Sequence, residues 1–211
     1  LIHVAYGMVS LIDENGNQVA MSTRNGTVVL LQDVLDKCHE KCLQVIENKN
    51  PDLEDKETVA RQVGTGAVIF GALSNSKIKD IAFSYDKILN FDGETGPYVQ
   101  YTAARIKSVL RKGGEPQPYA LPEVNDDEYE LISLLATFPE TVKSAVEKLE
   151  PFYITRYAIE VASAFNKFYF DCRIIGEKPE VCNFRLDICR ATLTVLTNAL
   201  TLLGIKIPER M

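Results

Sequence analysis

A short polar segment near the start of the chain combines residue types that suit a phosphate group. Met21-Ser22-Thr23-Arg24-Asn25-Gly26 places two hydroxyls, a guanidinium and a glycine between a predicted strand and a predicted helix. Hydroxyls and free backbone N–H groups donate hydrogen bonds to an oxyanion, and arginine adds charge in a bidentate geometry. The segment therefore suits an oxyanion or phosphate, although a solvated turn can have the same composition.

Two tyrosines and an arginine in the middle of the chain form a second candidate site. At about 100° per residue, Tyr98, Tyr101 and Arg105 share one stripe of a predicted helix. That stripe lies roughly 140° from the apolar stripe of the same helix. The apolar stripe consists of Val99, Ala103, Ile106 and Leu110. Tyrosine rings beside a guanidinium can stack bases and bind phosphate, but amphipathic tyrosines can also cover a bundle edge. Tyr169 allows the same two interpretations.

Two cysteines with a histidine between them raise the question of a metal site. Cys38 and Cys42 lie one helical turn apart, whereas His39 would point about 100° away from Cys38. No second pair in the sequence completes four ligands, so we expect helix packing and no metal site. The total of five cysteines is odd and forms no tight framework, which is typical of free thiols in the cytoplasm.

The overall charge limits the ways in which the chain can bind nucleic acid. The net charge is −6 and the pI is about 5.1, whereas proteins that bind by general electrostatic attraction are basic. A local basic strip from Arg105 to Lys112 contains four basic residues and no acidic one. No apolar run approaches the ~18 residues of a membrane span, so we expect no membrane partner.

The sequence pattern predicts a mainly helical fold. Residues 4–21 read as a β-hairpin around the turn at 13–17, and a further short strand is expected near residues 81–85. Gly64, Gly66 and Gly71 lie within a predicted helix, where each costs about 1 kcal/mol relative to alanine, which indicates close packing against another backbone. The predicted helices cover residues 30–48, 55–73, 97–112, 126–137, 140–149, 151–171 and 181–203. Long amphipathic helices joined by short loops indicate an antiparallel bundle.

Four separated motifs together resemble landmarks of the arginyl-tRNA synthetase family. His3–Val9 leading to Met21–Val29 is similar to the KMSKS region, and Phe91–Tyr101 followed by Ala104-Arg105-Ile106 is similar to the start of the anticodon-binding domain. Residues 162–169 and 208–211 resemble the last two landmarks of the family. The motifs occur in colinear order over essentially the whole chain, so the resemblance is specific.

The resemblance implies a class I ligase that joins arginine to its tRNA through an arginyl-adenylate made from ATP. In this family the KMSKS loop stabilises charge on the departing pyrophosphate, so Ser22, Thr23 and Arg24 are the expected catalytic residues. The ATP phosphates are expected to contact Met21, Ser22, Thr23, Arg24 and Gly26. ATP is then a substrate, accompanied by Mg²⁺ in the parent enzyme, and this chain by itself is expected to bind no cofactor.

The sequence departs from the family pattern in two respects. Ala20 and Asn25 stand where many relatives carry lysines, which reduces the positive charge of the loop. Neither His3 nor His39 begins a His-x-Gly-His motif. The nucleotide-binding core and the arginine pocket are therefore expected upstream of Leu1, and the chain alone is expected not to aminoacylate.

The resemblance also implies a set of anticodon contacts. In this family, tyrosines and an arginine of the helical domain contact the anticodon loop together with the C-terminal methionine. These roles carry over to Tyr98, Tyr101, Arg105, Tyr169 and Met211, whereas Arg173 replaces an aromatic of some relatives. The expected partners are arginine tRNA and, through the upstream domain, ATP and arginine, but not DNA or a membrane.

The resemblance divides the chain into three parts. Residues 1–32 would be the tail of the catalytic domain, 33–96 a connecting helical region and 97–211 a helical bundle of the class I anticodon-binding type. A free-standing tRNA-binding paralogue without catalysis is the alternative, which the departures in the loop favour and the retained Ser22, Thr23 and Arg24 oppose. A plain helical interaction protein would leave the four motifs to coincidence.

Overall fold

The computed structural model of the chain describes residues 2–12, 18–19, 29–115 and 117–211. The strands are β1 (Val9–Ile12), β2 (Gln18–Val19) and β3 (Ile81–Phe83). The helices are α1 (Leu31–Lys49), α2 (Lys56–Leu73), α3 (Tyr85–Ile88), α4 (Gly96–Gly113), α5 (Asp126–Ala136), α6 (Phe138–Lys148), α7 (Phe152–Asp171) and α8 (Pro179–Leu202). Among the described residues, none of the helices is long and apolar enough to cross a membrane.

The small sheet joins the start of the chain to a distant segment. β1 pairs with β2 in antiparallel orientation, as predicted for the hairpin, and the strand predicted near residues 81–85 is β3. β1 also pairs with β3 in parallel orientation, with Val9 opposite Ile81. The sequence did not predict this second pairing, because strands 72 positions apart, as Val9 and Ile81 are, leave no local signal of their pairing.

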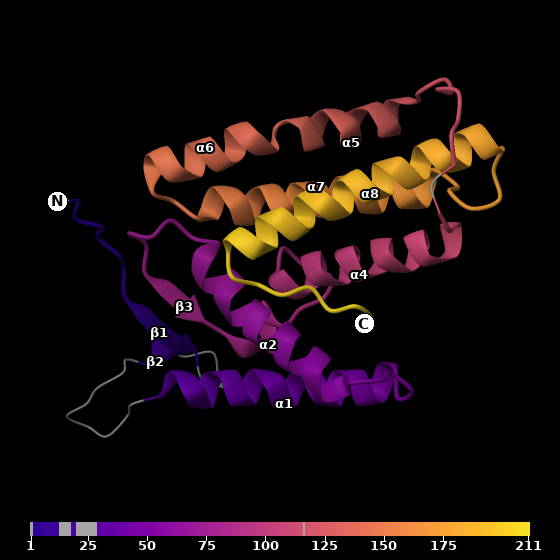
Figure 1. Cartoon of the computed structure of the whole chain (residues 1–211). Helices are drawn as coiled ribbons and strands as arrows, with labels where there is room; N and C mark the ends of the chain where they lie inside the picture. Colours follow the sequence, from indigo (N-terminus) through magenta and orange to yellow (C-terminus); the bar gives the residue numbers. More distant parts are fainter. Residues whose placement is uncertain (1, 13–17, 20–28, 116) are drawn as a thin grey trace.

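α1 and α2 pack closely against each other beside the sheet (Figure 1). A Cβ atom added at Gly64 would lie 3.0 Å from the backbone of Cys38, which confirms the close backbone approach expected there. The Gly66 backbone also lies close to another helix, since a Cβ atom added at Gly96 of α4 would lie 3.0 Å from the Gly66 carbonyl oxygen. At Gly71 the expectation was wrong, because the atoms near an added Cβ belong to the side chain of Ile88. Cys38 is fully buried in this interface.

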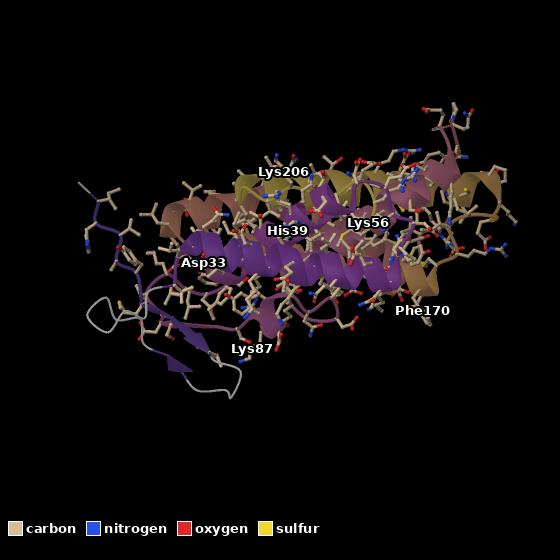
Figure 2. The ribbon with its side chains drawn as sticks, turned by 90° about the horizontal axis from the view of Figure 1, so that it is seen from below. Asp33, His39, Lys56, Lys87, Phe170 and Lys206 are labelled. Atoms are coloured by element: carbon tan, nitrogen blue, oxygen red, sulfur yellow. The ribbon has the colours of Figure 1, made fainter. Side chains whose placement is uncertain are left out.

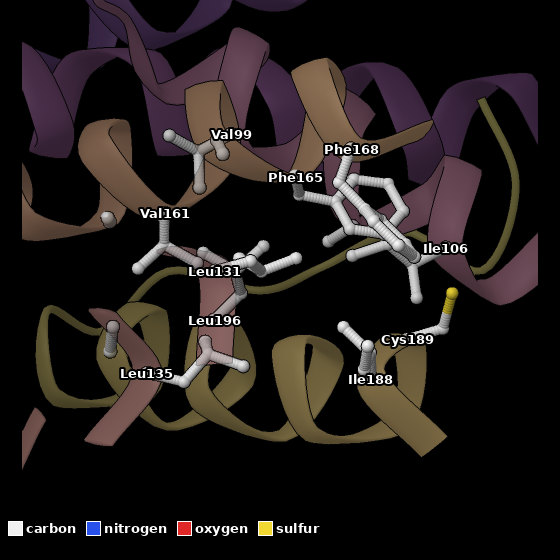
Figure 3. Packing of buried hydrophobic residues seen from close by; sticks show 14 of the residues in the cluster. Val99, Ile106, Leu131, Leu135, Val161, Phe165, Phe168, Ile188, Cys189 and Leu196 are labelled. Carbon is white, nitrogen blue, oxygen red and sulfur yellow. The ribbon is translucent and has the colours of Figure 1, made fainter. Parts of the chain in front are cut away.

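The second half of the chain forms the predicted helical bundle. Figure 1 shows α7 and α8 lying between α4 on one side and α5 and α6 on the other. Phe165 and Phe168 are fully buried at the centre (Figure 3), and each such side chain contributes about 1.5–3 kcal/mol through burial. This large core and the small sheet confirm the predicted fold class, a mainly helical fold in which a helical bundle follows a short β segment along the chain.

α4 begins and ends where the sequence places its signals. Pro97 lies in its first turn, the Thr95 hydroxyl accepts a hydrogen bond from the Tyr98 N–H at 3.3 Å, and Gly114 ends the helix with φ of 75°. The predicted start of the last helix was two residues late, because α8 begins at Pro179, a residue suited to a first helical turn. The four-residue α3 was not predicted.

Candidate nucleic-acid interface

Arg105 brings α4 and α7 together at the surface of the bundle. Its guanidinium carbon lies 4.9 Å from the ring centroid of Tyr101 and 5.4 Å from that of Tyr169. Both distances are typical of cation–π contacts. The expected convergence of these three residues is therefore confirmed, although Tyr169 lies more than 60 residues after Arg105 in the sequence.

Asn166 fixes the position of Arg105. It lies within the 162–169 motif but was not named as a site residue from the sequence. Its side-chain oxygen accepts a hydrogen bond from Arg105 Nη1 at 2.7 Å. Its amide nitrogen donates to the Tyr98 hydroxyl at 3.0 Å and to Thr102 Oγ1 at 3.1 Å. The available signal was its spacing, since Asn166 lies three residues before Tyr169 and so on the same face of α7.

The three tyrosines differ in how far they face solvent. Tyr101 is 41% exposed and Tyr169 is 42% exposed, so both rings are partly accessible, although Phe165 stacks against the Tyr169 ring. Tyr98 is less exposed than the other two, because it packs against the core of the bundle. Phe170, which follows Tyr169, is 88% exposed and projects from the end of α7 (Figure 2).

A cavity of about 430 Å³ lies beside Tyr101 and Arg105, within the usual size range of small-ligand pockets. The apolar part of its lining, here called the floor, comes from α1, α2 and the loop between them, with Cys42, Ile46, Leu53, Val59 and Val63. Lys49, Asn50 and Asp92 add polar groups to the lining, to which Met211 also belongs. The described residues therefore place Met211 with Tyr101 and Arg105, as expected.

A second hollow of about 620 Å³ continues the first, and the two share Tyr101, Arg105 and Met211. Its lining contains four basic side chains and two acidic ones. The basic residues are Arg105, Arg111, Lys112 and Arg210, and the acidic ones are Asp52 and Glu54. Three of the four basic residues of the strip noted in the sequence, all except Lys107, thus line a concave surface that includes the Tyr101 ring, an arrangement suited to a single-stranded nucleic acid.

The polar loop at residues 21–26 lies outside the described residues. Met21, Ser22, Thr23, Arg24 and Gly26 therefore remain phosphate-binding and catalytic candidates on sequence grounds alone. In the chain they follow β2 and precede α1.

Cys38 and Cys42 lie in the α1–α2 interface, in agreement with the packing interpretation. Burial raises the pKa of Cys38 to about 11 and that of Cys42 to about 12, so both thiols stay protonated at neutral pH. Nε2 of His39 lies 2.9 Å from Oε2 of Glu57 on the neighbouring helix. In the part of the chain that the structure describes, no three His, Cys, Asp or Glu side chains are grouped to hold a metal ion.

Comparison with protein-family models gives two matches that together span most of the chain. Residues 99–211 match the DALR anticodon binding domain. Residues 1–85 match the catalytic domain of class I (R) tRNA synthetases. The candidate interface lies largely within the first match, and the polar loop lies within the second.

The individual proteins that the chain matches are named arginine–tRNA ligase or arginyl-tRNA synthetase. The chain is 51% identical to arginine–tRNA ligase of Halothermothrix orenii and 45% identical to that of Clostridium beijerinckii, in both cases over its whole length. It spans 37% of the length of these curated relatives. Among solved structures, Thermus thermophilus arginyl-tRNA synthetase superposes with a TM-score of 0.89 at 34% identity, over 99% of this chain and 35% of that one.

Proposed function

Because the chain belongs to the arginyl-tRNA synthetase family, of which it carries the DALR anticodon-binding domain and part of the class I catalytic domain, we propose that it binds the anticodon loop of arginine tRNA. The observation that carries this proposal is the position of Arg105 between two half-exposed tyrosines, at the rim of an apolar pocket. The site residues are Tyr98, Tyr101, Arg105, Tyr169 and Met211.

The chemistry of the interface suits unpaired bases. A loop base can stack on the accessible part of the Tyr101 or Tyr169 ring, which is worth about 1–3 kcal/mol per base. Arg105 can then pair with a phosphate or with a base edge. A second base can enter the pocket between Tyr101 and Met211, where the apolar floor excludes water. The acidic net charge of −6 is compatible with this mode, because recognition rests on stacking and local basic groups.

The test is competition between two RNA hairpins for arginine tRNA. An anticodon stem-loop hairpin with the arginine anticodon should displace the whole tRNA from the chain, because it presents the loop that the interface would bind. A hairpin of the acceptor stem with the same number of base pairs should displace it far less. Equal displacement by both hairpins would contradict the proposal.

We further propose that the loop at residues 21–26 contacts the phosphates of ATP in the aminoacylation reaction. Ser22, Thr23 and Arg24 would stabilise charge on the leaving pyrophosphate, and the hydroxyl and backbone donors of Met21 to Gly26 would bind the phosphates. Mg²⁺ would accompany ATP, and arginine would bind to the rest of the catalytic domain. In this proposal residues 1–32 belong to the catalytic domain, and residues 33–96 connect it to the anticodon-binding bundle at 97–211. The protein acts in the cytoplasm, without DNA or membrane partners.

Arg24→Ala tests the proposed role of the loop once the chain is joined to a complete catalytic domain. Arginine activation should slow by roughly 2–4 kcal/mol of barrier, the size of one lost charge-stabilising donor, while tRNA affinity should barely change. An equal loss in both would show that the loop is structural. Unchanged activation would contradict the proposed role of the loop. If the unsubstituted chain binds tRNA but supports no arginine activation, the tRNA-binding paralogue without catalysis is favoured.

A further inference from the structure

The last residues of the chain run alongside α4 and end in the candidate interface. In Figure 1 the yellow C-terminal segment leaves α8 and runs alongside α4 to the end marked C. Ile205 and Pro208 are buried, whereas Glu209 and Arg210 are exposed. Met211 is half-buried and packs against the apolar cluster of the α1–α2 pair. The segment therefore connects the bundle to the floor of the pocket.

Three side chains of α4 hold this segment at successive levels. The fully buried Gln100 donates from Nε2 to the carbonyl oxygen of Lys206 at 2.7 Å. Lys107 Nζ donates to the carbonyl oxygen of Pro208 at 3.3 Å, and Arg111 Nη1 donates to that of Glu209 at 3.3 Å. These donors are spaced by seven and then four residues, so they share one face of the helix.

The Glu209 side chain makes the last contacts with α4 before the C-terminus. Its Oε2 lies 2.9 Å from Lys107 Nζ, and its Oε1 lies 2.7 Å from Arg111 Nη1. The Glu209 side chain is 70% exposed, and such exposed ion pairs contribute little to global stability. Residues 205–211 lie outside any helix or strand, so two ion pairs on one carboxylate have their main effect on the position of the two residues that follow.

We propose that Glu209 is a positioning residue of the anticodon site, which through its ion pairs with Lys107 and Arg111 holds Met211 beside Tyr101 and Arg105. The proposal rests on the proposed function for its ligand, the anticodon loop. Glu209 does not itself contact RNA in this account. It raises the fraction of molecules whose tail is docked, and apparent affinity falls in proportion when that fraction falls.

The sign of the effect separates positioning from simple charge. An acidic side chain near RNA repels phosphates, so its neutralisation alone should strengthen binding. A positioning role predicts the opposite result for Glu209→Gln, a change that keeps the shape of the side chain and removes the charge. Glu147→Gln is the matched control, since Glu147 is also exposed but lies on α6, away from the C-terminal segment.

The first measurement needs no RNA and follows release of Met211 by carboxypeptidase A from the folded chain. With Glu209→Gln, release should be about threefold to tenfold faster than from the wild type, since two exposed ion pairs are lost. Glu147→Gln should match the wild type. Equal release from Glu209→Gln and wild type would overturn the positioning role, whatever the RNA results.

The second measurement is a titration with arginine tRNA, accompanied by thermal melts. Glu209→Gln should bind about threefold to tenfold more weakly, with an unfolding midpoint equal to that of Glu147→Gln. With Met211→Ala already present, adding Glu209→Gln should weaken binding no further, because the positioned side chain is gone. Tighter binding by Glu209→Gln, or fully additive losses, would overturn the proposal. A wild-type chain that does not bind arginine tRNA would instead refute the proposed function.

Discussion

The guanidinium carbon of Arg105 lies 4.9 Å from the centre of the Tyr101 ring, and the two residues are one turn apart on α4. The same guanidinium lies 5.4 Å from the Tyr169 ring on α7. One cation therefore fixes the relative position of two rings from different helices, while both rings stay accessible. This arrangement organises the surface before any ligand arrives, which lowers the ordering cost of binding.

Replacing Arg105 with alanine should weaken binding of arginine tRNA and change its dependence on salt. If Arg105 pairs with a phosphate, the slope of log affinity against log salt should become less steep by about one. Titrations at several salt concentrations measure both quantities. Arg156→Ala is the control, because Arg156 is exposed on α7 and pairs only locally, with Glu160. An unchanged slope with weaker binding would assign Arg105 to a base or to ring positioning.

Replacing Asn166 with alanine should affect both stability and binding. The change removes the acceptor for Arg105 and the donor to Tyr98 and Thr102. At about 0.5–1.5 kcal/mol for each hydrogen bond, the free energy of unfolding should fall measurably in denaturant titrations. tRNA affinity should fall as well, because the Arg105 side chain loses its fixed position. Wild-type affinity in a folded Asn166→Ala chain would contradict this account of the site.

The sequence predicted the helices and residues of the site better than the tertiary contacts that join them. The positions of Tyr101, Arg105 and Tyr169 follow from helical spacing and from the family motifs, and the structure brings them together. Asn166 was missed because an asparagine within a helix gives no signal of its partner on another helix. The parallel pairing of β1 with β3 was missed for a similar reason, since both depend on tertiary contacts that local patterns do not encode.

Glu150 should make the stability of the chain depend on acid pH. Desolvation would by itself raise the pKa of Glu150, but hydrogen bonds from the Lys77 N–H, the Ser76 hydroxyl and the Lys77 ammonium lower it overall. Because the pKa is lowered on folding, the contribution of Glu150 to the free energy of unfolding is complete above the unfolded-state pKa of about 4.3. It is then lost as pH falls through the folded-state value.

Thermal melts between about pH 6 and the acid limit of folding measure this dependence. Glu150→Gln should reduce the loss of stability on acidification and should lower stability at neutral pH. Glu147→Gln, on the exposed surface of α6, is the control. If Glu150→Gln and wild type lose stability in parallel on acidification, the ion pair with Lys77 contributes nothing to the pH dependence.

The cysteines should react with thiol reagents in a fixed order. Burial raises the pKa to about 11 for Cys38 and to about 12 for Cys42 and Cys189, so little thiolate is present and access is blocked. Cys182 is only half-buried. Mass spectrometry after brief iodoacetamide treatment should therefore find label on Cys182 first and on the four buried cysteines, which include Cys172, only after unfolding. Early labelling of Cys38 would show that α1 separates from α2 in the native state.

The most direct test of the account combines a change in the protein with a change in the RNA. Wild type, Tyr101→Ala and the control Tyr129→Ala, whose ring is 68% exposed on α5, are titrated with arginine tRNA and with a transcript whose anticodon is replaced. Tyr101→Ala should lose about 1–3 kcal/mol of binding to arginine tRNA and much less to the altered transcript, with its unfolding midpoint unchanged. Equal losses on both RNAs, or a loss that only follows a lower unfolding midpoint, would contradict anticodon recognition at this surface.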